Sequence, residues 1–151
     1  MKILFVCTGN TCRSCMAEAI FNKHCTLNNI SAISAGLAAV KSSRTSKYSA
    51  ELVSENCDIN ISNREAVQLT KDMLDNSDLV LTMTSYMKDM LLSSFPHMKN
   101  KVFFLNEYVG IKGDIADPFG GDKAIYSETF KQLKNSIELL IAKLKEDKSA
   151  L

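Results

Sequence analysis

A short apolar run that stops at a polar loop constrains the fold of this chain more than any other feature. Residues 2–6 include Ile3-Leu4-Phe5-Val6, a composition typical of a strand buried on both faces. The polar loop begins at Cys7, and residues 14–27 have the apolar spacing of a helix. This order directs backbone N–H groups and the positive end of a helix dipole at one point. The sequence therefore predicts an anion site, most naturally for phosphate, directly after the first strand.

The alternation of strands and helices continues along the chain. Further strands are expected at 31–36, 78–83 and 101–105, and further helices at about 45–56, 70–75, 84–93 and 122–146. This order predicts an α/β fold: a four-stranded parallel twisted sheet with helices on both faces. Residues 1–151 are expected to form a single domain, because no repeat or linker interrupts them. Residues 106–121 are rich in Gly, Asp and Pro and are expected to form a long functional loop.

Composition restricts the partners and the compartment. The formal net charge of +1 gives no strong field for nucleic acid or an anionic membrane, and neither is expected as a partner. No apolar run is long enough for a signal peptide or a membrane span, so a soluble, cytoplasmic protein is expected. The five cysteines are odd in number, which argues against a disulfide framework. The one Cys12-x-x-Cys15 pair lacks a second pair, so neither a metal nor a cofactor is expected.

The ends of the polar loop carry reactive side chains. Cys7 opens the loop and Arg13 closes it, with five residues between them. N–H donors and a guanidinium acidify a thiol, and a guanidinium forks onto phosphate oxygens. A plain turn with a buried thiol is the alternative, but Gly9 and Asn10 tolerate the positive φ angles that an anion-binding nest needs. The loop is therefore interpreted as a thiolate nucleophile aimed at a bound phosphate.

Cys7 to Ser14, a Cys followed by five residues, an Arg and a Ser near the N-terminus, resembles the signature of the low-molecular-weight protein phosphatase family. The resemblance covers nearly the whole chain. It implies that Cys7 is the nucleophile and that Arg13 and the N–H groups of residues 8–13 bind phosphate. The loop residues implied in binding are Thr8, Gly9, Asn10, Thr11, Cys12 and Ser14. Asn10 would fix the loop shape, and Ser14 would donate to Cys7, cap the helix, or do both.

The general acid of that family is the Asp of an Asp-Pro pair before the last helix, and Asp117-Pro118 matches it. Asp114 lies nearby but lacks the following Pro. The resemblance implies two steps. Cys7 attacks phosphorus while Asp117 protonates the leaving atom, and ionised Asp117 then activates water to hydrolyse the cysteinyl-phosphate.

Thr11 and Phe119 indicate which phosphorylated side chain is the substrate. Family members acting on phosphotyrosine commonly have a bulky aliphatic residue at the Thr11 position and aromatic pairs after Asp-Pro. Thr11 and Phe119-Gly120-Gly121 instead resemble the bacterial branch that dephosphorylates protein arginine. Phosphoarginine proteins are therefore the expected substrates, phosphotyrosine proteins the alternative, and inorganic phosphate the product. Residues 41–46 are candidates for the pocket rim.

Two rival functions fit the sequence less well, and one residue departs from the family pattern. A thiol-dependent arsenate reductase would need relay cysteines downstream, and none follows Cys57. A non-catalytic phosphate-binding module would be expected to lack either Cys7 or Asp117. The family usually has Pro after Ser14, but this chain has Cys15, which gives up the rigidity of a helix-starting Pro. A reversible Cys7–Cys12 disulfide is a further hypothesis, since it would protect the nucleophile from overoxidation.

Overall fold

The computed structural model describes residues 1–149 and contains one parallel sheet with the strand order β2-β1-β3-β4. The strands are β1 (Lys2–Cys7), β2 (Ser31–Gly36), β3 (Leu79–Thr82) and β4 (Val102–Phe104). The helices are α1 (Arg13–His24), α2 (Lys47–Cys57), α3 (Lys71–Asp75), α4 (Ser85–Ser94), α5 (Leu105–Val109) and α6 (Lys123–Ser149), with a 3-10 turn η1 (Pro96–Met98). The predicted α/β fold is confirmed.

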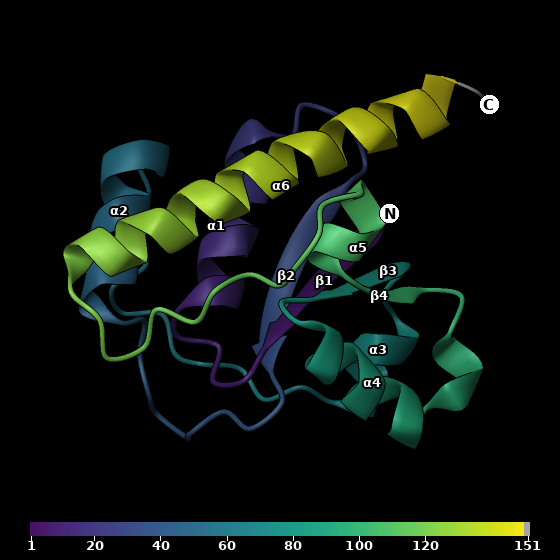
Figure 1. Cartoon of the computed structure of the whole chain (residues 1–151), viewed down its shortest axis with the longest axis horizontal. Helices are drawn as coiled ribbons and strands as arrows, with labels where there is room; N and C mark the ends of the chain where they lie inside the picture. Colours follow the sequence, from purple (N-terminus) through teal and green to yellow (C-terminus); the bar gives the residue numbers. More distant parts are fainter. Residues whose placement is uncertain (150–151) are drawn as a thin grey trace.

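Helices cover both faces of the sheet (Figure 1). Alternate residues of β1 supply the two cores, because successive side chains of a strand point to opposite faces. Ile3 and Phe5 pack in the larger core with residues of α1, α2, α5 and α6. Leu4 and Val6 pack in the smaller core with residues of α3, α4 and η1. Buried on both faces, β1 places its last residue at a fixed point at the carboxyl edge of the sheet.

The sequence-based boundaries hold with a few corrections. The first helix ends at His24 instead of residue 27, and the Cys25 backbone is extended. The expected loop over 106–121 begins as a short helix, α5, which ends at Val109 and is capped by Gly110 with a φ of 82°. Asn106 explains that helix, because its side chain donates to the Gly113 carbonyl oxygen at 3.0 Å and accepts from the Ser136 hydroxyl at 2.6 Å. Contacts with α6 thus stabilise a turn that the local sequence did not indicate.

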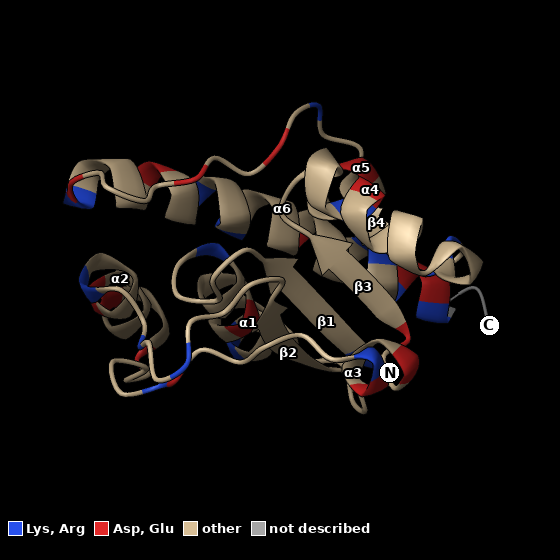
Figure 2. Ribbon diagram, turned by 90° about the horizontal axis from the view of Figure 1, so that it is seen from below, with Lys and Arg blue, Asp and Glu red and all other residues tan. Residues whose placement is uncertain are grey.

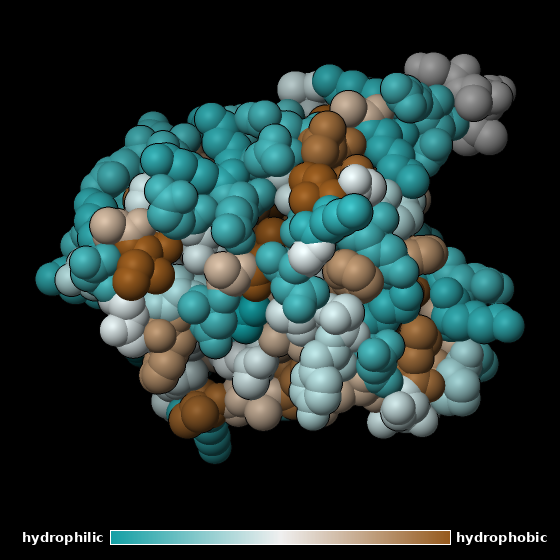
Figure 3. All heavy atoms as spheres, viewed as in Figure 1, coloured by the Kyte–Doolittle hydropathy of each residue, from teal (hydrophilic) through white to brown (hydrophobic). Residues whose placement is uncertain are grey.

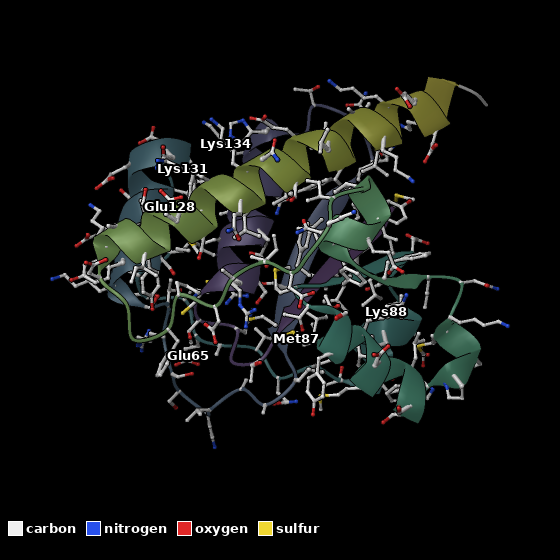
Figure 4. The ribbon with its side chains drawn as sticks, viewed as in Figure 1. Glu65, Met87, Lys88, Glu128, Lys131 and Lys134 are labelled. Atoms are coloured by element: carbon white, nitrogen blue, oxygen red, sulfur yellow. The ribbon has the colours of Figure 1, made fainter. Side chains whose placement is uncertain are left out.

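Charged residues lie on the loops and the outer faces of the helices, and the strands of the sheet are almost free of them (Figure 2). The face shown in Figure 3 is largely hydrophilic with scattered apolar patches. On α6, Glu128, Lys131 and Lys134 point away from the sheet (Figure 4). Among the described helices, none has the length and apolar character needed to cross a membrane.

Candidate active site

The loop after β1 is shaped by one residue with positive φ and by a close contact from β2. Asn10 has a φ of 58°, the left-handed conformation that Asn tolerates better than most residues. Gly36 pairs with Cys7 in the sheet. A Cβ atom on Gly36 would lie 2.6 Å from the Thr8 carbonyl oxygen, so only glycine fits there.

The carbonyl oxygens of the loop bond to the chain that follows β2. Those of Cys7 and Thr8 accept from the backbone N–H groups of Leu37 and Ala38, both at 2.9 Å. The Thr11 carbonyl oxygen accepts from the N–H of Ser46, also at 2.9 Å. With these three carbonyl groups engaged on that side, the other side of the loop is left for N–H groups, as expected of an anion-binding nest.

The Cys7 sulfur receives two hydrogen-bond donors. The Ser14 hydroxyl oxygen lies 2.8 Å from Cys7 Sγ, and the backbone N–H of Asn10 donates to the same sulfur at 3.2 Å. Ser14 Oγ also accepts from the Asn10 side-chain amide at 2.7 Å, which leaves the Ser14 proton for the sulfur. Cys12, not Ser14, is the N-cap of α1. Of the two roles considered for Ser14, the donor to Cys7 is therefore the one the structure supports.

Arg64 supports the loop from behind, and sequence reasoning missed it. Its guanidinium donates to Asn10 Oδ1 and to Ser34 Oγ, both at 2.9 Å, and lies 3.5 Å from the Glu18 carboxylate. The Asn10 amide in turn donates to Ser34 Oγ at 3.0 Å. Asn10 therefore has partners on both ends of its side-chain amide, which fixes it in the left-handed conformation. The segment 63–67 that carries Arg64 was polar and ambiguous in sequence, so no local signal pointed to this role.

Arg13 joins the loop to the segment before α6. Its guanidinium donates to the Ile115 carbonyl oxygen at 3.1 Å and lies 3.8 Å from the Asp117 carboxylate. Arg13 is buried, whereas the Asp117 side chain is 60% exposed. The Asp117 carboxylate also accepts from the N–H of Phe119 at 3.1 Å. Asp114, the nearby alternative, instead accepts from the N–H of Ser85 at the start of α4.

These groups surround a cavity of about 440 Å³. Its walls are Cys7, Thr8, Gly9, Asn10, Thr11, Cys12, Arg13, Val40, Ser43, Asp117 and Phe119. All the predicted site residues except Ser14 line this cavity, and Ser14 contacts the Cys7 sulfur behind it. Val40 was not predicted. Only Ser43 of the candidate rim 41–46 reaches the wall. Val40 and Phe119 are 70% and 82% exposed, so both offer apolar surface at the mouth.

Cys12 occupies a polar niche at the side of the loop. Its thiol donates to Ser46 Oγ at 3.5 Å, and the Tyr126 hydroxyl lies 3.5 Å from its sulfur. Burial raises the pKa of Tyr126 to about 12, and the hydrogen bond with Cys12 adds to the shift. Cys7 and Cys12 are both free thiols. The disulfide between them stays a prediction.

Cys15, which replaces the usual Pro, is fully buried and its thiol donates to the Cys12 carbonyl oxygen at 3.2 Å. Burial raises the pKa of the Cys15 thiol well above its ordinary value, so this group stays protonated. Cys15 therefore acts as a small packing residue in the first turn of α1. Within residues 1–149, no three His, Cys, Asp or Glu side chains lie together in a way that could hold a metal ion.

Comparisons with known proteins agree with this geometry. Residues 2–150 match the family model described as low molecular weight phosphotyrosine protein phosphatase. The chain is 40% identical to a protein-arginine-phosphatase of Bacillus subtilis, over 98% of this chain and 99% of that protein. It is 41% identical to the low molecular weight protein-tyrosine-phosphatase PtpB of Staphylococcus haemolyticus, over 88% of this chain and 92% of the relative.

A solved structure of the YwlE arginine phosphatase from Geobacillus stearothermophilus superposes with a TM-score of 0.90 at 39% identity, covering 99% of this chain and 96% of that one. Sequence, fold and the loop between β1 and α1 thus lead to one assignment. The chain belongs to the low molecular weight phosphotyrosine protein phosphatase family.

Proposed function

We propose that this protein is a cysteine-dependent phosphatase that removes phosphoryl groups from arginine residues of phosphorylated proteins. The observation that carries the proposal is the arrangement at the cavity floor, where Cys7 Sγ accepts from Ser14 and Asn10 while Arg13 and Asp117 line the same cavity. A nucleophile, an anion cradle and a proton source are the parts that phosphoryl transfer requires.

The reaction begins when the Cys7 sulfur attacks phosphorus in line. The S–P bond forms, the bond from phosphorus to the leaving nitrogen breaks, and Asp117 gives its proton to that nitrogen. Arg13 and the N–H groups of residues 8–13 hold the phosphoryl oxygens throughout. In the second step a water oxygen attacks phosphorus, the S–P bond breaks, and Asp117 takes the proton of the water. Inorganic phosphate then leaves.

The cavity walls support arginine as the substrate side chain. Phe119 is the one aromatic wall, and Val40 is the aliphatic residue at the mouth. A phenyl ring gains most from a slot with aromatic faces on two sides, whereas a guanidinium can stack on one exposed ring. Thr11 lines the cavity, and a Thr hydroxyl is a group that can hydrogen-bond a guanidinium. The relative from Bacillus subtilis is named for the same activity.

The purified protein is expected to release inorganic phosphate from a phosphoarginine peptide faster than from the phosphotyrosine peptide of the same sequence. Both reactions are run with a chelator present. Cys7→Ser is expected to abolish release, and Asp117→Asn to slow it by about 10²–10⁴. Activity that survives Cys7→Ser would refute the mechanism. Absence of any turnover by the wild type would refute the phosphatase proposal itself.

Phosphotyrosine is the second candidate substrate, favoured by the name of the family and by the relative PtpB. Two substitutions at one site separate the candidates. Thr11→Val removes only the hydroxyl, whereas Thr11→Ile also adds bulk. If the hydroxyl selects arginine, both variants lose preference for the phosphoarginine peptide. A preference for the phosphotyrosine peptide in the wild type would establish the second candidate instead.

We also propose the cytoplasm as the location. Cys7, Cys12, Cys15, Cys25 and Cys57 are all free thiols in the structure. Free thiols of this number persist in the reducing interior of cells.

A further inference from the structure

The segment that carries Asp117 is exposed, yet its backbone is firmly anchored. It runs from α5 back along the first turns of α6 (Figure 1). The N–H of Ile115 donates to the Met83 carbonyl oxygen at 3.0 Å, and the Ile115 carbonyl oxygen accepts from Arg13. Ile115 is thereby fixed between the end of β3 and the phosphate loop. Its side chain is buried, but Ala116 and Asp117 are exposed.

Two side chains of α6 hold the peptide groups on either side of Ala116, the residue immediately before Asp117. The Thr129 hydroxyl donates to the Ala116 carbonyl oxygen at 3.2 Å. The Gln132 side-chain oxygen accepts from the Ala116 N–H at 3.1 Å. These residues are three apart on a helix, so their side chains lie on neighbouring turns of one face. Both hydrogen-bonding groups of Ala116 are thus satisfied by α6.

We propose that Thr129 and Gln132 are positioning residues that hold Asp117 in line with the leaving group. This proposal rests on the proposed function, because it assigns a task to Asp117. The Asp117 side chain is 60% exposed, and its carboxylate has two neighbours, the Phe119 N–H at 3.1 Å and the Arg13 guanidinium at 3.8 Å. Since one of these neighbours is a backbone N–H of the same segment, the direction of the carboxyl group depends on the backbone around it, which α6 anchors at Ala116.

A general acid matters most when the leaving group is a strong base. A leaving group that is a weak base departs without a proton, whereas a strongly basic one needs it at the moment of bond breaking. Removing a hydrogen bond to Ala116 misplaces Asp117, the proton donor, but leaves Cys7, Arg13 and the N–H groups of the phosphate loop unchanged. The loss of rate should therefore grow with the basicity of the leaving group, because small misplacements of a catalytic group are costly.

The test uses a series of aryl phosphates with leaving phenols of increasing pKa, from dinitrophenyl to unsubstituted phenyl phosphate. kcat/KM is the readout, because it reports the steps up to release of the phenol. Thr129→Val removes the hydroxyl and keeps the shape of the buried side chain, and Gln132→Leu removes the exposed acceptor. Each is expected to lower kcat/KM for phenyl phosphate by about tenfold, and that for dinitrophenyl phosphate by less than about twofold.

Conservative variants and a double-mutant cycle separate positioning from a general structural role. Thr129→Ser and Gln132→Glu keep the donor and the acceptor and should retain most of the phenyl phosphate rate. Lys131→Leu, on the solvent side of α6 (Figure 4), is the matched surface control and should have no effect. In an Asp117→Ala background, Thr129→Val should cause no further loss, since the group it positions is gone.

A uniform loss across all leaving groups, or an additive loss in the Asp117→Ala background, would overturn the positioning role. Both results leave the phosphatase proposal standing. The phosphatase proposal fails on a different observation, namely a wild-type protein that releases phosphate from neither these esters nor the phosphoarginine and phosphotyrosine peptides.

Discussion

At the scale of single residues, the loop conformation depends on a side chain that never lines the cavity. The Arg64 guanidinium donates to Asn10 Oδ1, and the Asn10 side-chain amide donates to Ser14 Oγ. Ser14 Oγ in turn contacts the Cys7 sulfur. The Arg64 side chain is 19% exposed and Glu18, its ion-pair partner, 25% exposed. Because these groups lie behind the loop, their loss should act on the active site only through Asn10.

Arg64→Met is therefore expected to remove one donor from Asn10 Oδ1, which keeps the Val67 N–H. It also removes one donor from the Glu18 carboxylate, which keeps the Ser34 hydroxyl. The free energy of unfolding should fall by about 1–3 kcal/mol, the net contribution of hydrogen bonds made by a partly buried charged group. Urea denaturation measures that loss, and kcat/KM should fall with it. Arg44→Met is the control, since the Arg44–Glu65 pair is 51% and 60% exposed and such pairs contribute little. Equal small losses in both variants would contradict the role of Arg64.

Tyr126 gives a prediction in alkaline solution. Burial, aided by the hydrogen bond with Cys12, raises the pKa of Tyr126 to about 12 in the folded protein, whereas an ordinary Tyr has a pKa of about 10. Below about pH 10 the Tyr126 phenol keeps its proton in both the folded and the unfolded protein, so its ionisation does not change the free energy of unfolding. As the pH rises from about 10 to about 12, the phenol ionises first in the unfolded chain, so the folded state loses stability.

The wild type should thus lose about 2–3 kcal/mol more stability than Tyr126→Phe between pH 10 and pH 12. Denaturant unfolding of both proteins at a series of alkaline pH values measures the difference. Tyr86→Phe, at a residue 71% exposed, is the control and should follow the wild type. A difference that does not change with pH would show that the Tyr126 phenol titrates normally.

At the scale of elements, β2 determines the shape of the phosphate loop as directly as the loop residues do. The strand ends at Gly36 beside Cys7, and the chain beyond it bonds to the loop carbonyl oxygens. α1 then continues from the loop, with Cys12 as its N-cap. The loop is consequently held at both ends by the sheet and by a helix, which keeps its N–H groups in place without a ligand.

Gly36→Ala tests this contact. The new Cβ would meet the Thr8 carbonyl oxygen at 2.6 Å and the Gly9 carbonyl carbon at 3.0 Å, so the loop must move. We expect a loss of about 1–3 kcal/mol in stability together with weaker phosphate binding. Gly9→Ala is the comparison for stability alone, because its Cβ would meet only Thr11 Oγ1, at 3.8 Å. If Gly36→Ala were as stable as Gly9→Ala, the contact would not constrain the loop.

At the scale of the whole molecule, the cavity lies where three parts of the chain converge. The loop after β1 forms its floor, Val40 and Ser43 come from the chain before α2, and Asp117 and Phe119 from the chain before α6. The helices that follow these two segments, α2 and α6, contact each other. The rings of Tyr48 and Tyr126 meet edge to face at 5.6 Å, and Lys123 pairs with Glu51 and Glu55.

Because folding assembles this site, inorganic phosphate should bind only the folded chain and stabilise it. The melting temperature should rise with phosphate concentration, and the stabilisation should reach about 2.7 kcal/mol at a hundred times the dissociation constant. Differential scanning calorimetry with and without phosphate measures this effect. Arg13→Ala should abolish it, whereas Arg44→Ala should retain it. Sodium chloride at equal ionic strength separates phosphate binding from a general salt effect.

The sequence by itself determined the features that depend on neighbours along the chain. The strand, polar loop and helix around Cys7 are local patterns, and so is the Thr70 cap of α3, whose hydroxyl accepts from the Met73 N–H. The pair Asp117-Pro118 was indicated by the family resemblance, which implies an Asp-Pro pair before the last helix. The alternation of elements was enough to predict the parallel sheet, because strands joined by helices pair in parallel.

Only the tertiary structure decided which distant groups support those residues. Arg64 reaches Asn10 across 54 positions of the sequence, and α5 depends on a contact between Asn106 and Ser136. Thr129 and Gln132 looked like ordinary helix residues until α6 was placed beside Ala116. Such contacts have no periodicity or motif, because they depend on how whole elements pack and not on the spacing of residues within one element.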